Sequence, residues 1–527
     1  MQAAHNDDLR DQEDAPFLPG EQGSSAPPRY NDRAANAARE KLRWRLIITL
    51  FAMILTVETG NAMVSGPTTR IYEAIACRDY YQAHDPSKIG NGGQIPEELC
   101  KNSEIQSEVA IVKGYGELFD GLTSIFLAIP YGLLADRMGR KPTILLSIPG
   151  FILNMVSTLV VLWFSNVFPL RAVWFSSLAW LLGGGLVVAA ALVWTMMADV
   201  TTDAQRATMF FQFGVAVMGS EFISSMISSW LMQLNPWIPM LLGWGIMLGG
   251  IFAALSLPET KNAFPTSANE MSDFNRQEDE DEVEVEAPRN YGRLFGRNTL
   301  LRRSWARVKS IVAPYSFITA DKQVLLLLSA FLVYKLSRGT SWFLVQYVSL
   351  RYGWTIARAN LLTSLKSILT VVLFVAGLPA VSWYLMKYRG VDSRQKDLIL
   401  TKSSIVCLLV GTLGIGLSPT APLMITCLVI QTLGQGFVYA TRSIITTMIQ
   451  RDQTARLYTI IEIIQALGMI LASPIITAFF QWGLKLGGFW VGLAWMVGTI
   501  LFVIVAWAIW SVKLPYVPKT TLDSEEE

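Results

Sequence analysis

Charged residues are scarce in this sequence. Aspartate, glutamate, lysine and arginine make up 16% of its 527 residues, whereas hydrophobic residues make up 52%, and the mean hydropathy is +0.38. Soluble globular domains carry about 25% charged residues. The composition therefore excludes an ordinary soluble enzyme and predicts a protein of the lipid bilayer.

Several signals of soluble chemistry are also missing. The sequence has no GxxxxGK[ST] phosphate loop and no HExxH motif, and its two histidines, His5 and His84, lie outside the long apolar runs. These absences argue against ATP hydrolysis, against a histidine metal site and against an enzyme. We expect no cofactor and no nucleic-acid partner. The polar first 45 residues lack an apolar run that ends in a cleavage site, so no cleaved signal peptide is expected.

Long apolar runs are what the sequence does contain. A helix needs about 20 mostly apolar residues to cross a hydrocarbon core roughly 30 Å thick. Twelve such windows lie at 46–65, 114–134, 143–164, 172–197, 207–231, 237–257, 324–347, 360–384, 398–417, 421–448, 457–480 and 488–510. We therefore predict an all-α membrane protein with twelve transmembrane helices.

Basic residues gather on one side of these windows. They precede 46–65, follow 114–134, precede 324–347 and follow 360–384. The positive-inside rule then places both termini in the cytoplasm. The predicted organisation is a cytoplasmic tail (1–45), an N-terminal six-helix bundle (46–257) with a long outer loop (66–113), a cytoplasmic linker (258–321), a C-terminal six-helix bundle (322–511) and a cytoplasmic tail (512–527).

The four cysteines are too few for a disulfide scaffold. Cys77 and Cys100 both fall in the predicted outer loop, where they either pair or remain two unlinked thiols. Cys407 and Cys427 lie within apolar windows, which is typical of packing residues.

A weak internal repeat relates the two predicted bundles. Three pairs of residues recur at a separation of about 250 residues: Pro130 with Pro379, Gly185 with Gly436, and Arg206 with Arg456. A parallel repeat of six helices places a solute site near the membrane midplane, between the halves.

A charged motif lies between the second and third windows. Its residues are Gly132, Asp136, Arg137, Gly139, Arg140 and Lys141. In type and spacing the motif resembles the loop that marks transporters of the major facilitator superfamily, together with Asp199, Arg206 and Pro258-Glu259-Thr260 further along. The resemblance implies a gate on the cytoplasmic face, in which Asp136 meets a helix N-terminus and guanidinium groups. The alternative, basic anchors of the positive-inside kind, explains Lys141 easily and Asp136 poorly.

The first loop narrows this resemblance. The pattern SGPTTRIYEAIAC, followed by a second cysteine, is similar to the branch of the proton-coupled folate transporter and to fungal metabolite efflux transporters. The fifth window reads FGVAVMGSEF and lacks the glycine and proline signature of drug/proton antiporters, which argues against a simple multidrug exporter.

Ionisable side chains within the windows are costly unless they are paired or hydrated, so each is a candidate functional residue. Their signs are divided between the halves. The acids, candidates for proton coupling, are Glu58, Asp120 and Glu221 of the first half. The bases, candidates for binding an anionic or carbonyl-bearing solute, are Lys335, Arg338, Lys366 and Arg442 of the second half.

Each charge also has a structural alternative. Each acid could instead form a structural ion pair or a polar contact between helices. Arg442 could instead form an ion pair with Glu58 or Glu221 when no solute is bound. Polar and aromatic residues of the apolar windows could line the predicted solute cavity between the halves together with these charges. They are Asn61, Gln212, Tyr334, Trp342, Gln346, Gln435 and Tyr439.

Together these features predict a monomeric secondary transporter that moves a small organic solute by alternating access. Proton-coupled efflux of a metabolite or toxin is the leading function. Proton-coupled uptake of an organic anion or nutrient, or a non-transporting solute sensor, are the alternatives, and the short C-terminal tail argues against the sensor. We expect the plasma membrane, with the vacuolar membrane as the alternative.

Overall fold

The protein is described here from a computed structural model that covers residues 30–90, 95–200, 203–257, 322–446, 448–449 and 454–512. Every regular element within these residues is a helix. Eleven helices are long and apolar enough to cross a membrane, and a shorter apolar helix covers Val187–Met197. The predicted all-α membrane fold is confirmed.

The described part of the N-terminal half contains six α-helices and four 3₁₀ segments. The helices are α1 (Tyr30–His84), α2 (Ser103–Met138), α3 (Arg140–Trp163), α4 (Gly185–Val200), α5 (Asp203–Leu234) and α6 (Trp237–Ala253). The 3₁₀ segments are η1 (Pro86–Lys88), η2 (Glu97–Cys100), η3 (Leu170–Leu181) and η4 (Ala254–Ser256).

The C-terminal half builds its spans from shorter pieces. They are α10 (Lys322–Arg338), η6 (Gly339–Phe343), α11 (Leu344–Tyr352), α12 (Ile356–Val372), the π-helical segment η7 (Leu373–Gly377), α13 (Leu378–Arg389), α14 (Ser393–Leu417), α15 (Ala421–Leu433), η8 (Gly434–Gly436), α16 (Phe437–Thr446), α17 (Thr454–Leu486), η10 (Gly488–Gly492) and α18 (Leu493–Ser511).

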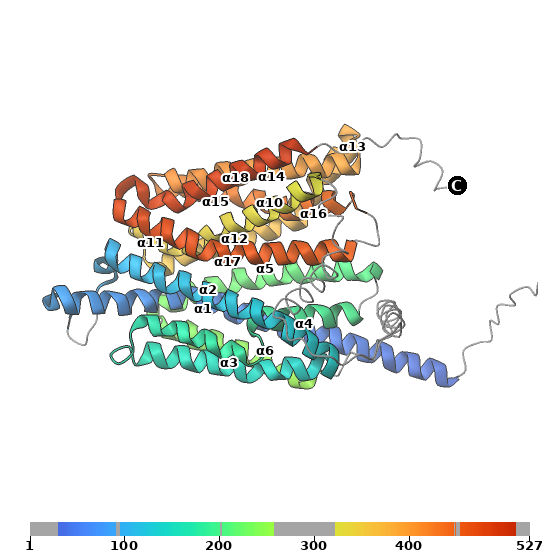
Figure 1. Cartoon of the computed structure of the whole chain (residues 1–527), viewed down its shortest axis with the longest axis horizontal. Coiled ribbons are helices and arrows are strands. Elements are labelled where there is room, and N and C mark those ends of the chain that lie inside the picture. The colour runs from blue at the N-terminus through green and yellow to red at the C-terminus, as the bar shows by residue number, and fades with distance from the viewer. Residues whose placement is uncertain are drawn as a thin grey trace, which may run out of the picture.

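The halves lie side by side, with the helices of each running roughly parallel to a common long axis (Figure 1). Each half has apolar clusters of buried side chains. The one around Phe343, Tyr347 and Trp495 in the C-terminal half also includes Ala110 of α2. Two helix pairs make most of the contact between the halves: α5 packs against α12, and α2 packs against α17. Helix α1 also contacts α12.

Two names are used below for the ends of this bundle. The disulfide end is where α1 ends and α2 begins, beside Cys77 and Cys100. The linker end is where η4 ends and α10 begins.

The predicted outer loop was too long. Helix α1 continues to His84 and α2 begins at Ser103, so the connection between them covers residues 85–102 instead of 66–113. Helix α1 also begins at Tyr30, within the predicted tail. A hydropathy window measures the thickness of the lipid core, whereas a helix continues into water wherever its backbone hydrogen bonds persist.

The fourth predicted span, 172–197, is not one continuous helix. It is divided into η3 and α4 by Gly183, Gly184 and Gly185, which have φ values of 88°, 80° and 76°. Side chains are rarely tolerated at such angles, and a Cβ atom at Gly183 would overlap the backbone of Ser147. The matching span of the second half is interrupted at η8, which ends at Gly436, the repeat partner of Gly185.

Some predicted features lie outside the described residues. They are the linker 258–321 with Pro258-Glu259-Thr260, most of both tails, and the side chains of Asp136, Asp199, Arg206 and Arg456.

Candidate functional site

Asp120 is held within its own half of the molecule. Its Oδ1 atom accepts hydrogen bonds from Ser177 Oγ at 2.6 Å and from Trp180 Nε1 at 2.9 Å. Both donors belong to η3, so the carboxylate ties α2 to the broken fourth span. This is the polar helix–helix contact that the sequence left open as an alternative to proton coupling.

Glu58 and Glu221 lie close enough for their charges to interact. Glu58 is half-buried on α1 and lines a mostly apolar pocket with Val57, Ile144 and Phe151. Glu221 is half-buried on α5. Two carboxylates that share a partly buried site repel one another when both are ionised, so a cation or a proton stabilises the pair.

The bases of the second half form a connected group. Lys335 lies within electrostatic range of Arg338, Arg442 and Glu462. Lys366 on α12 lies within electrostatic range of Arg338 and, across the interface, of Glu221. The structure therefore brings an acid of the first half and bases of the second half together, as the unequal distribution of charges predicts.

Arg442 has a partner that the sequence interpretation did not assign. Its Nη2 atom lies 2.6 Å from Glu462 Oε1, an ion pair between α16 and α17. The alternative in which Arg442 pairs with Glu58 or Glu221 stays a prediction. Glu462 is exposed. Pairing depends on how each helix is rotated about its axis, which spacing along the chain does not reveal.

The polar residues expected around the cavity separate into two groups. Asn61 and Tyr439 are exposed, and the Tyr439 ring packs edge-on against Phe374 at 5.1 Å between centroids. Gln346 and Tyr334 are buried. Tyr334 stacks on Phe437 with its ring centroid 5.2 Å away, within the core of the C-terminal half.

The charged motif surrounds the turn from α2 to α3. Gly139 joins the two helices with a φ of 103°, and its carbonyl accepts a hydrogen bond from Thr143 Oγ1 at 2.9 Å. A positive φ explains the need for glycine at this point of the motif. Arg137 is exposed, whereas Arg140 and Lys141 are half-buried. Gly132, one helical turn or more before them, has no atom within 4 Å of a Cβ position.

Tyr131 connects this region to the broken span. Its hydroxyl donates to the carbonyl of Leu181 at 2.8 Å and accepts from the Gly183 N–H at 2.7 Å. One side chain of α2 thus satisfies backbone groups on both sides of the break.

Lys113 is a functional candidate that the sequence interpretation missed. Its Nζ atom donates to Thr69 Oγ1 at 2.9 Å and, across the interface, to the Trp342 carbonyl at 3.1 Å. Lys113 is the last residue of the predicted outer loop (66–113), so it was not considered as a residue of a helix. A signal was present, because Lys113 and Glu117 are four residues apart and share one face of a helix.

Other polar contacts join the halves near the disulfide end. Asn360 Nδ2 donates to Ser229 Oγ at 2.9 Å, and the hydroxyls of Ser225 and Ser364 lie 2.6 Å apart. Ser473 Oγ donates to the carbonyl of Gly114. The two helix pairs of the interface are therefore tied by buried hydrogen bonds.

Cys77 and Cys100 form a disulfide, with their Cα atoms 5.3 Å apart. Of the two alternatives left open by the sequence, the structure contains the bonded one. Cys407 is half-buried and Cys427 is buried, both as free thiols.

Comparison with known proteins places this arrangement in a family. A family model described as Major Facilitator Superfamily matches residues 119–400. The chain is also 37% identical to the MFS-type transporter aprT of Aspergillus flavus, over 97% of this chain and 96% of that protein. The chain belongs to the major facilitator superfamily. It is therefore a multi-pass membrane transporter and not an enzyme.

Further relatives agree with this assignment. The chain is 33% identical to the MFS efflux pump atnC of Emericella nidulans, over 95% of this chain and 93% of that protein. Among solved structures, the nucleoside transporter NupG matches with a TM-score of 0.56 and 12% identity, over 89% of this chain and 99% of that chain. The human organic anion transporter MFSD10 matches with a TM-score of 0.51 and 16% identity, over 89% and 99%. At these identities the two structures show the fold alone.

Proposed function

We propose that this member of the major facilitator superfamily exports a small polar organic solute in exchange for protons, as a monomer in the plasma membrane. The observation that carries the proposal is the charge group across the interface, in which Lys366 of one half lies within electrostatic range of Glu221 of the other. The names of two relatives, the efflux pumps atnC and ustT, support the outward direction.

The bases suit the acceptor groups of the solute. Lys335, Arg338 and Lys366 lie on α10 and α12, and a carboxylate or carbonyl oxygen placed among them would accept charge-assisted hydrogen bonds. Asn61 and Tyr439 are exposed and offer further polar contacts. Arg442 contributes a positive charge at the edge of this group, where it is already paired with Glu462.

The acids determine the sign of the coupling. A donor group of the solute that occupies Glu58 and Glu221 excludes the protons that would otherwise stabilise this pair. Solute and proton then bind alternately, which produces exchange. An anion that binds Lys366 only after Glu221 has taken up a proton would instead travel with that proton. Exchange with protons corresponds to export, and transport together with a proton corresponds to uptake.

Both cases are distinguishable in sealed proteoliposomes with an imposed pH gradient. A mixture of small organic acids and fungal metabolites is added, and the solutes retained are measured with and without the protein. Exchange concentrates a solute in the more acidic compartment, and cotransport concentrates it in the more alkaline one. Protein-free liposomes control for passive distribution of weak acids and bases.

Two variants test the charged residues. Glu221→Gln and Lys366→Met are expected to reduce gradient-driven accumulation by about tenfold or more, a loss of about 1.4 kcal/mol or more of coupling free energy. Glu98→Gln, at an exposed position in η2, is the matched control and is expected to behave as the parent. Solute binding without accumulation under any gradient would contradict coupled transport and support a sensor.

A further inference from the structure

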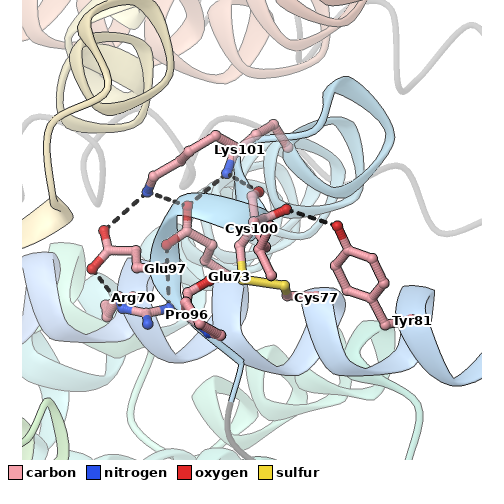
Figure 2. The surroundings of a disulfide bond; sticks show 10 residues. Arg70, Glu73, Cys77, Tyr81, Pro96, Glu97, Cys100 and Lys101 are labelled. Atoms are coloured by element: carbon pink, nitrogen blue, oxygen red, sulfur yellow. Dashed lines mark hydrogen bonds and ion pairs between the residues drawn. A yellow bond between two sulfur atoms is a disulfide. The ribbon is translucent and has the colours of Figure 1, made fainter. Parts of the chain in front are cut away.

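A group of charged residues lies beside the disulfide. Lys101 Nζ is 2.6 Å from Glu73 Oε1 and 2.9 Å from Glu97 Oε1 (Figure 2). Arg70 is 3.3 Å from Glu73 through Nη1 and 3.1 Å from Glu97 through Nε. The side chain of Glu73 is 1% exposed, and those of the other three are at most 18% exposed. Two carboxylates and two cations thus form one compact network, largely removed from water.

The disulfide holds this network in place. Cys77 follows Glu73 by four residues on α1, so both lie on the same face of that helix. Cys100 ends η2 and directly precedes Lys101. Tyr81, one turn further along α1, donates its hydroxyl to the Leu99 carbonyl at 3.1 Å. The covalent bond and this hydrogen bond fix η2, and with it Glu97, against α1 (Figure 2).

Glu97 also reaches the other half of the molecule. Its Oε1 atom accepts a hydrogen bond from the backbone N–H of Ile356 at 2.7 Å. Ile356 is the first residue of α12, whose leading N–H groups have no partner within the helix. The Thr355 hydroxyl oxygen accepts a hydrogen bond from another of these groups, the backbone N–H of Arg358, at 3.3 Å. A carboxylate in this position is further stabilised by the positive end of the helix dipole.

A second connection runs from the same network. Gln106 Nε2 donates to Glu73 Oε1 at 2.6 Å. Gln346 on α11 donates to the Gln106 carbonyl at 2.7 Å and to its Oε1 atom at 2.9 Å. The network is therefore linked to the other half at α11 and at α12.

We propose that Glu97 is a gating residue of the transport cycle. Its carboxylate, positioned by the Cys77–Cys100 disulfide, holds the N-terminus of α12 and keeps the disulfide end closed. Opening of this end requires Glu97 to release Ile356. Arg70 and Lys101 remain with Glu97 when it does so, because all three belong to the N-terminal half. The carboxylate therefore keeps its counter-charges in both states, and the released N–H group is taken over by water.

This proposal rests on the transport function, because it assigns a step of alternating access. It is tested without a solute, by distances between spin labels in the full chain in lipid nanodiscs. Cys407 and Cys427 are replaced by alanine and the native disulfide is kept. Labels at Asn166→Cys and Lys485→Cys, two exposed positions at the disulfide end of opposite halves, report the opening of this end.

Glu97→Ala removes the acceptor and is expected to raise the population with long distances by about tenfold or more. Glu97→Gln keeps an acceptor oxygen without the charge and is expected to give a smaller increase. Glu98→Ala, the exposed neighbour, is expected to match the parent. Cys77→Ala with Cys100→Ala is expected to act like Glu97→Ala, and combining the three changes is expected to add little, since they affect one contact.

A second variant removes the donor instead of the acceptor. Ile356→Pro deletes the backbone N–H group at the first helical position, where proline is tolerated, and also replaces a buried side chain. Thr355 has φ −63° and ψ 149°, which suits a residue before proline. Ile356→Val, which trims one methyl group and keeps the N–H, is the control for lost packing. The expected result is opening with proline and little change with valine.

The proposal is overturned if monodisperse Glu97→Ala and Ile356→Pro proteins give the distance distributions of their controls. The outcome is independent of the flux assay. If the variants open the disulfide end but the parent protein moves no solute, the gating role of Glu97 is supported and the transport mechanism is contradicted. Loss of flux without opening would contradict the gate.

Discussion

The two ends of the bundle differ in how the halves meet. At the disulfide end, buried polar groups cross the interface, as in the contacts of Gln106 with Gln346 and of Glu97 with Ile356. Toward the linker end, α13 contains no buried residue among those described, and Gly214 and Gly219 on α5 have no atom within 4 Å of a Cβ position. The described conformation is therefore closed at the disulfide end and looser at the linker end.

This difference indicates what each end requires of its residues. A closed end is held by hydrogen bonds that must all form together, because a buried polar group without a partner is costly. Where the two halves separate during transport, the side chains between them become exposed to water or lipid. Such an end therefore tolerates charged residues and amino-acid substitutions. Substitutions at the two ends should therefore differ in how strongly they change the contact between the halves.

Gly114→Val is expected to have the largest effect. A Cβ atom at Gly114 would overlap the side chain of Thr477 on α17, so valine prevents α2 and α17 from closing. Overpacking of this kind costs about 3 kcal/mol, and the short label distance at the disulfide end should be almost lost. Gly116→Val is the matched control, because Gly116 has open space and the same helix propensity cost. Equal distance distributions for the two variants would show that the α2–α17 contact does not set the closed state.

Much of this fold was predictable from the sequence. The twelve apolar windows follow from the thickness of the bilayer, and Gly139 in the charged motif follows from the turn that it makes. The interruption of the fourth span was not predicted, although Gly183, Gly184 and Gly185 were visible. A glycine run is compatible with close packing as well as with a break, and the outcome depends on Ser147 and Tyr131 of other helices.

The site was predicted in its composition but not in its pairing. Opposite charges in the two halves predicted a charged interface, and Lys366 does lie near Glu221. The partners of Asp120 and Arg442 were not predicted, because they depend on helix rotation and on a contact with η3. Lys113 and Glu97 were overlooked because both lay in a segment assigned to a loop.

Removal of the disulfide is expected to have the next largest effect, and it should fall on one end. Cys77 and Cys100 are 23 residues apart, and closing a loop of that length stabilises a fold by about 2 to 3 kcal/mol. Cys77→Ala with Cys100→Ala should lower the apparent melting temperature and speed amide hydrogen exchange in residues 95–106. Cys407→Ala, at a half-buried free thiol, is the control. Faster exchange at the linker end alone would contradict a local role.

Lys113→Met is expected to have a moderate effect on the closed end. Methionine retains most of the side-chain length but loses the hydrogen bonds to Thr69 and to the Trp342 carbonyl. A hydrogen bond from a charged donor contributes about 1.5 kcal/mol or more, so the open population at the disulfide end should rise roughly tenfold. Lys88→Met, an exposed lysine at the same end, should leave the distances unchanged. An unchanged distribution for Lys113→Met would place the closing energy elsewhere in the interface.

Glu108→Gln should have the smallest effect, although it breaks a well-formed ion pair at the same end. Glu108 binds Arg171 through two contacts of 2.7 Å, which are as short as those of Glu73 with Lys101. The Arg171 side chain is 53% exposed, and both residues belong to the N-terminal half. An exposed pair contributes about 0.5 kcal/mol, so the melting temperature should fall slightly and the distance between the halves should stay the same. A large opening after Glu108→Gln would mean that charge at the disulfide end, rather than contact across the interface, controls the gate.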